Sequence, residues 1–165
     1  MKRRMFIAGN WKLNLGPQAS GQLASDLRSL ASSYREMDLA VFPSTLALST
    51  TTKALKGTHI DVGIQCIHTE PSGAFTGANS AESAREANCT HALIGHSEQR
   101  TLFGVTNEHV RLKIRAALRA GLLPLVCIGE TLQQRQAQQQ QSIVKQQLSE
   151  ALDGLESDEV ATLTL

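Results

Sequence analysis

The sequence has little net charge, few cysteines and no long hydrophobic run. Its 165 residues carry 16 Lys plus Arg against 15 Asp plus Glu, so the formal net charge is +1. A balance this close to zero gives no global field that would attract nucleic acid or an anionic membrane. Charged residues make up 19% and hydrophobic residues 41% of the chain, which argues for one soluble globular domain and against a disordered protein.

Targeting segments and paired cysteines are also lacking. The basic residues 1–4 precede only the short apolar stretch 5–9 before Asn10 interrupts it, which is too short for a signal peptide. No other stretch approaches a membrane span. The three cysteines are far apart and have no paired redox or metal-ligand spacing: Cys66, Cys89 and Cys127. We therefore expect reduced thiols in a cytoplasmic protein.

What the sequence does contain is a repeated alternation of short apolar runs and segments with helical spacing. The apolar runs predict parallel strands at 5–8, 39–42, 60–65, 91–95, 122–128 and 160–165. The segments after them predict helices at 17–31, 43–56, 79–88, 106–120 and 131–152. Asn79 and Thr106 are the expected caps of the third and fourth of these helices.

This alternation is typical of an α/β fold, and its periodicity is compatible with either a β/α barrel or an open doubly wound sheet. A complete eight-stranded barrel usually needs about 250 residues. A barrel built from the 165 residues here would be incomplete, with five β/α units and a sixth strand.

The predicted carboxyl ends of the strands carry candidate functional side chains, because that edge holds the working residues of β/α barrels. After the first strand, Asn10 and Lys12 offer an amide and an ammonium for an anionic, oxygen-rich ligand. A surface Lys beside a structural Trp is the alternative interpretation.

The fourth predicted strand is followed by His96, just before a helix start at Ser97. Aligned N–H groups at a helix start oppose an added positive charge, which favours a neutral imidazole. A neutral ring can donate a hydrogen bond that polarises a substrate carbonyl, and a capping or packing role is the alternative. At the end of the fifth strand, Cys127 is expected to be a buried small apolar residue and not a nucleophile.

Metal binding is not predicted. The remaining four histidines have no metal-ligand spacing with one another or with carboxylates: His59, His68, His91 and His109.

Four motifs, in this order, resemble those of the triosephosphate isomerase family. They are Ala-Gly-Asn-Trp-Lys-Leu-Asn at 8–14, Ser-Gly-Ala-Phe-Thr-Gly at 72–77, Ile-Gly-His-Ser-Glu-Gln-Arg at 94–100 and Cys-Ile-Gly-Glu-Thr at 127–131. The resemblance covers the whole chain and implies a (β/α)8 TIM barrel, with residues 1–165 as the amino-terminal part of its single domain. It also implies a cytoplasmic homodimeric isomerase of glycolysis and gluconeogenesis that uses no cofactor.

The resemblance implies roles for individual residues. Asn10 and Lys12 would contact the triose phosphate substrate, and Lys12 would stabilise negative charge on an enediolate. His96 would be the neutral electrophile, and Glu98 would support this arrangement. This family is itself a standard example of a neutral histidine at a helix amino terminus, so the role of His96 comes from the resemblance.

Parts of the family pattern are missing. The proton-abstracting Glu of the family lies in an Ala-Tyr-Glu-Pro-Val-Trp segment that ends the sixth strand, and this segment does not occur in the sequence. The Gly-rich loops that grip the phosphate after the seventh and eighth strands do not occur either. We therefore expect poor activity from the 165 residues alone. The alternative function is an inactive structural partner or barrel fragment that assembles with itself or with a complementary chain.

The implied subunit interface is the loop 73–77, with Phe75, Thr76 and Gly77. Three nearby residues depart from the family pattern: Cys66, Ala78 and Gln99. At the last two positions the family commonly has a Glu and an Arg that pair across the dimer, and losing both leaves no unpartnered buried charge. Because six strands leave open edges, we expect self-association through barrel edges as well as through this loop.

Overall fold

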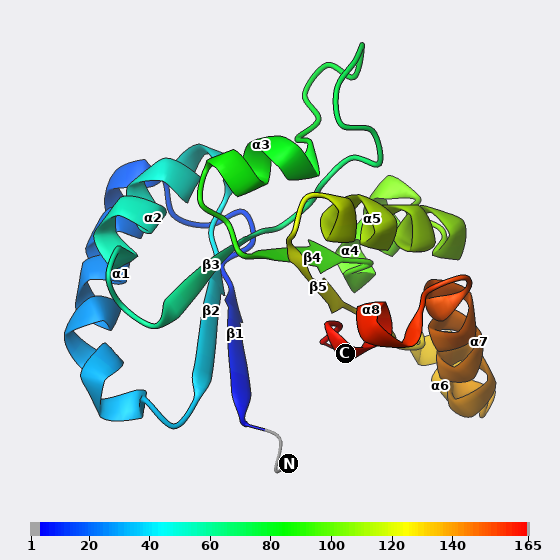
Figure 1. Cartoon of the computed structure of the whole chain (residues 1–165). Coiled ribbons are helices and arrows are strands. Elements are labelled where there is room, and N and C mark those ends of the chain that lie inside the picture. Colours follow the sequence, from blue (N-terminus) through cyan, green and yellow to red (C-terminus); the bar gives the residue numbers. More distant parts are fainter. Residues whose placement is uncertain (1–3, 165) are drawn as a thin grey trace.

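A five-stranded parallel sheet forms the centre of the structure, a computed structural model that describes residues 4–164 (Figure 1). The strands lie in sequence order and curl into a half-barrel: β1 Phe6–Asn10, β2 Asp38–Phe42, β3 Ile60–Ile64, β4 His91–Ile94 and β5 Leu123–Val126. The register pairs Asn10 with Phe42 and Ile94 with Val126, so carboxyl ends meet at one edge. The first five predicted strands and the incomplete α/β barrel are confirmed.

Helices follow the strands and cover one face of the sheet. They are α1 Pro17–Ala31, α2 Leu48–Leu55, α3 Ala81–Glu86, α4 Ser97–Phe103, α5 Asn107–Arg119, α6 Leu132–Gln136, α7 Gln140–Leu152 and α8 Ser157–Ala161, with 3-10 turns η1 Ser32–Tyr34 and η2 Thr45–Ala47. None of the helices within residues 4–164 has both the length and the apolar character needed to cross a membrane.

The sheet is apolar on both faces, as parallel strands require. Val41 and Ile64 pack with helix residues such as Ile114 in the larger buried cluster. Ala40 and Phe42 point the other way, into a second cluster made of strand residues and Cys127. Side chains alternate between the faces of a strand, so β2 contributes to both clusters.

The third predicted helix begins one residue later than expected. Ser80, and not Asn79, caps α3, because its hydroxyl accepts a hydrogen bond from the backbone N–H of Ser83 at 3.1 Å. The predicted cap Thr106 is confirmed, since its hydroxyl accepts from the N–H of His109 at 3.2 Å.

The predicted single helix over 131–152 is wrong. The chain forms α6 and α7 instead, and between them Gln138 adopts a left-handed conformation with φ of 56°. A helix cannot continue through that conformation, so the Gln-rich stretch folds back as two helices.

The predicted sixth strand over 160–165 is also wrong within the described residues. Val160 and Ala161 end α8, which starts where the backbone N–H of Glu156 donates to Glu159 Oε2 at 2.8 Å. Thr164 then forms one isolated parallel bridge with Leu125. Leu165 lies outside the residues that the structure describes.

Candidate active site at the carboxyl edge

The structure brings the four predicted site residues together at the carboxyl edge of the strands. Asn10 ends β1, and His96 lies two residues after the end of β4 at Ile94. Lys12 lies in the turn after β1, and its Nζ donates to Glu98 Oε1 in α4 at 2.8 Å. Residues far apart in sequence meet here because parallel strands align their carboxyl ends.

Lys12 is held in an unusual backbone conformation. Its φ is 54°, a left-handed value that costs free energy for a residue with a Cβ. Asn10 Oδ1 accepts a hydrogen bond from the Lys12 backbone N–H at 3.0 Å. Gln65 Nε2 donates to the Lys12 carbonyl at 2.9 Å and to the Phe42 carbonyl at 2.8 Å. These bonds fix the turn and aim the Lys12 side chain towards α4.

Gln65 was missed by sequence reasoning. It directly follows β3, so a polar side chain at the carboxyl end of a buried strand was the available signal.

His96 caps the amino terminus of α4. Its Nδ1 accepts a hydrogen bond from the backbone N–H of Glu98 at 3.3 Å and also lies 3.5 Å from Glu98 Oε2. The backbone N–H can serve only as a donor, so this contact requires an Nδ1 without hydrogen. A neutral ring then carries its hydrogen on Nε2, which is left to act as a donor. His96 therefore does cap α4, as the alternative interpretation predicted. This capping is compatible with the electrophile role, because it uses Nδ1 and leaves the Nε2 hydrogen available.

The electrostatics of the cluster centre on Glu98. The hydrogen bond from Lys12 holds the pKa of the Glu98 carboxyl below its ordinary value, and the positive charge of Lys12 acts in the same direction. The side chains of this pair are about half exposed, at 50% for Lys12 and 46% for Glu98. Glu98 is thus an anion at neutral pH that orients the Lys12 ammonium.

Arg100 connects this edge of the sheet and was also missed. Its Nε donates to the Gly95 carbonyl at 2.8 Å, its Nη2 to the Cys127 carbonyl at 3.3 Å, and its Nη1 to Asn107 Oδ1 at 2.6 Å. One side chain therefore joins the ends of β4 and β5 to the start of α5. Nothing in its spacing marks this role, because the partners are two backbone carbonyls and the side-chain amide of the first residue of α5.

The backbone before His96 requires glycine. Gly95 has a φ of 73°, and a Cβ there would lie 2.8 Å from Val110 Cγ2.

Nearby Cys127 packs into the second buried cluster, and burial raises the pKa of its thiol. Both observations agree with the prediction that Cys127 is a packing residue.

The predicted interface residues lie elsewhere. Phe75, Thr76 and Gly77 lie in the loop between β3 and α3, which projects from the body of the protein (Figure 1). The Phe75 ring lies over that of His68, with ring centroids 4.0 Å apart, and Phe75 is 44% exposed.

Two of the residues that depart from the family pattern contact each other. Cys66 Sγ lies 3.5 Å from Gln99 Oε1 and 3.5 Å from Lys113 Nζ. Ala78 is exposed. In the part of the chain that the structure describes, no group of three or more His, Cys, Asp or Glu side chains is arranged to hold a metal ion.

Comparison with known proteins assigns this arrangement to a family. A sequence model described as triosephosphate isomerase matches residues 5–165. The triosephosphate isomerase of Magnetococcus marinus is 43% identical over 157 residues, which span 94% of this chain and 62% of that protein. The triosephosphate isomerase of Coxiella burnetii is 41% identical over 152 residues, spanning 92% and 60%.

A solved structure gives the same result. The crystal structure of triosephosphate isomerase from Bartonella henselae is similar with a TM-score of 0.85 and 36% sequence identity, covering 95% of this chain and 65% of that one. The chain thus spans less than two thirds of the length of these relatives.

Proposed function

Because this chain belongs to the triosephosphate isomerase family, we propose that residues 1–165 form the amino-terminal part of one (β/α)8-barrel domain with that activity. The reaction is the interconversion of dihydroxyacetone phosphate and glyceraldehyde 3-phosphate by proton transfer through an enediolate. The observation that carries the proposal is the cluster of Asn10, Lys12, His96 and Glu98 at the carboxyl edge.

The geometry of the cluster suits the proposed chemistry. As a proton leaves the carbon next to the carbonyl, negative charge develops on the carbonyl oxygen. The Nε2–H of a neutral His96 can donate to that oxygen, and the Lys12 ammonium can stabilise its charge. Asn10 uses its Oδ1 on the Lys12 backbone, which leaves its amide N–H groups for the substrate. Proton transfer of this kind needs no cofactor.

The proposal also requires a general base. The resemblance implies the Glu of an Ala-Tyr-Glu-Pro-Val-Trp segment, which this sequence does not contain. A positioned base contributes about 10²–10⁴-fold to a rate. We therefore expect the 165-residue polypeptide to isomerise slowly by itself and faster when a second polypeptide supplies that segment.

A coupled enzymatic assay with glyceraldehyde 3-phosphate tests this. The 165-residue chain is measured alone and mixed with a polypeptide that carries the remaining strands of the Magnetococcus marinus relative. Lys12→Met should abolish the restored activity, whereas Lys145→Met, on the exposed face of α7, should leave it unchanged. Near-normal turnover by the chain alone would refute the need for the second polypeptide. Docking without activity would favour the structural-partner alternative.

Assembly is the second part of the proposal. Exposed Phe75 in the loop 73–77 offers a contact for a second copy, and β1 lies at an end of the described sheet with Ile7 48% exposed. We propose a homo-oligomer that uses this loop, the edges of the sheet, or both. Light scattering on the samples used for the assay measures this directly across a concentration series.

A further inference from the structure

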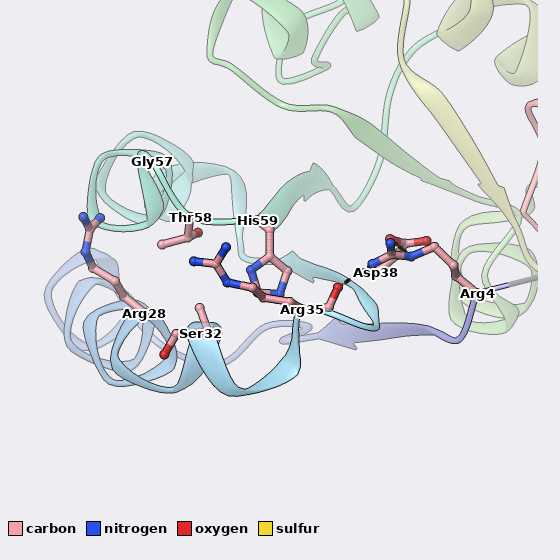
Figure 2. A pocket seen from close by; sticks show the side chains of 9 residues that line it. Arg4, Arg28, Ser32, Arg35, Asp38, Gly57, Thr58 and His59 are labelled. Carbon is pink, nitrogen blue, oxygen red and sulfur yellow. Dashed lines mark hydrogen bonds and ion pairs between the residues drawn. The ribbon is translucent and has the colours of Figure 1, made fainter.

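A polar cavity, drawn in Figure 2, lies at the amino-terminal edge of the sheet, away from the candidate active site. It has a volume of about 600 Å³, and its polar lining includes Arg4, Arg28, Ser32, Arg35, Asp38 and His59. Arg4 precedes β1, Asp38 starts β2 and His59 precedes β3. The cavity is thus at the amino ends of the strands, separated from Asn10 by the length of β1, roughly 16 Å for five residues.

The cavity concentrates positive charge. Three guanidinium groups line it, and the one lining carboxylate, Asp38, is paired with Arg4 at 3.0 Å. Within residues 4–164, neither Arg28 nor Arg35 has a carboxylate partner. Two guanidinium groups here therefore have no carboxylate partner, although the formal net charge of the whole chain is only +1. A concave surface of one sign raises the local concentration of counter-ions.

These two arginines differ in how they are held. Arg28 Nη1 donates to the carbonyls of Ala54 at 3.0 Å and Lys56 at 2.6 Å, at the carboxyl end of α2, so this guanidinium is fixed. The Arg35 side chain extends over the cavity towards Thr58, in front of His59 (Figure 2). In the described part of the chain its guanidinium makes no hydrogen bond, so all five N–H donors remain for a ligand.

His59 supplies a further polar group, and Ser32 also lines the cavity. His59 Nε2 lies 3.2 Å from the Tyr34 carbonyl, so it must carry a hydrogen, and its Nδ1 side remains open.

We propose that this cavity binds the phosphoryl group of a small phosphorylated compound. Guanidinium groups bind phosphate oxygens in a bidentate fashion, and the fork of Arg35 makes no other hydrogen bond in the described chain. A volume of about 600 Å³ exceeds that of phosphate alone and falls in the range of small-molecule sites. The proposal goes beyond the isomerase function and does not depend on it, because the cavity shares no residue with the cluster around Lys12.

Titration with inorganic phosphate, followed by amide NMR shifts in a buffer free of other oxyanions, tests the proposal. Saturable shifts are expected at Arg35, Thr58 and His59. Arg35→Gln should weaken binding about tenfold, which corresponds to about 1.4 kcal/mol. The substitution removes no hydrogen bond or ion pair of the Arg35 side chain within the described residues. Arg35→Lys keeps the charge but loses the fork geometry, and it should bind with intermediate affinity.

The control is Arg85→Gln, which likewise removes one charge from an exposed arginine; Arg85 donates to the Cys89 carbonyl at 3.4 Å. Glycerol 3-phosphate should bind at least as tightly as inorganic phosphate, because the cavity has room for its carbon chain. The proposal is overturned if the amides of Arg35, Thr58 and His59 show no saturable shifts. It is also overturned if Arg35→Gln and Arg85→Gln weaken phosphate binding equally, or if glycerol 3-phosphate does not bind. Shifts around Lys12 and His96 report separately on the proposed active site.

Discussion

Replacing Gly63 by Ala would test how tightly the strand-lined face of the half-barrel is packed. A Cβ at Gly63 would overlap Cε1 of Phe42 and lie 2.6 Å from its Cδ1. The Phe42 side chain has no exposed surface and packs beside Ala40 and Leu93, so its ring has little room to turn away. Overpacking of this kind costs about 1–3 kcal/mol. We expect the free energy of unfolding to fall by that amount.

The same change should reach the candidate active site. The Phe42 carbonyl accepts hydrogen bonds from the Trp11 backbone N–H at 3.0 Å and from Gln65 Nε2 at 2.8 Å. A shift of Phe42 therefore moves the turn that carries Lys12. The amide NMR signals of this turn should change even though Gly63 does not touch it.

Urea unfolding followed by circular dichroism measures the stability difference. Gly9→Ala is the matched control, since Gly9 lies in β1 and an added Cβ there would make ordinary contacts, the nearest at 3.7 Å. Its effect should stay within about 0.5 kcal/mol. Equal unfolding free energies for the two variants would refute the packing argument.

Two further predictions concern protonation. Burial lowers the pKa of His91 below its ordinary 6.5, against the opposing charges of Asp61 and Asp38. The unfolded chain therefore takes up this proton first, and the stabilising contribution is present above about pH 6.5 and is lost on acidification. His91→Gln should flatten the dependence of the urea midpoint on pH below about 6.5, and an unchanged slope would contradict this. Lys12→Met should raise the pKa of Glu98 towards its ordinary value, as read from the carboxyl carbon by NMR. An unaltered titration of Glu98, equal to that in Lys145→Met, would show that the ion pair is absent in solution.

The fold was predictable where local signals agree with packing. Short apolar runs located all five strands, and Thr106 marked the start of α5. The break at Gln138 was not predictable, because Gln is an ordinary helix former and the neighbouring Gln residues carry the same signal. Apolar and β-branched residues from Val160 onward indicated a strand, but the capping box of Glu156 and Glu159 starts a helix there.

The candidate site was also predictable only in part. The motifs identified the side chains that point out from the sheet edge, such as Lys12 and His96. They gave no role to Gln65, which lies outside them, or to Arg100, which ends the third motif; the partners of both include backbone carbonyls of distant segments. Such contacts depend on which strand ends become neighbours in the sheet. The spacing of residues within one segment does not predict that.

The bonds of Gln65 and Arg100 divide the candidate site into two separately anchored halves. Gln65 ties the Lys12 turn to β2, while Arg100 ties the backbone before His96 to β5 and α5. The Lys12 to Glu98 ion pair that bridges the halves is half exposed, and pairs of this kind are weakened by salt. The curvature of the sheet, and not that ion pair, therefore sets the spacing between ammonium and imidazole. A substitution that flattens or tightens the sheet far from either group would change the distance between the Lys12 ammonium and the His96 imidazole without replacing any side chain of the site.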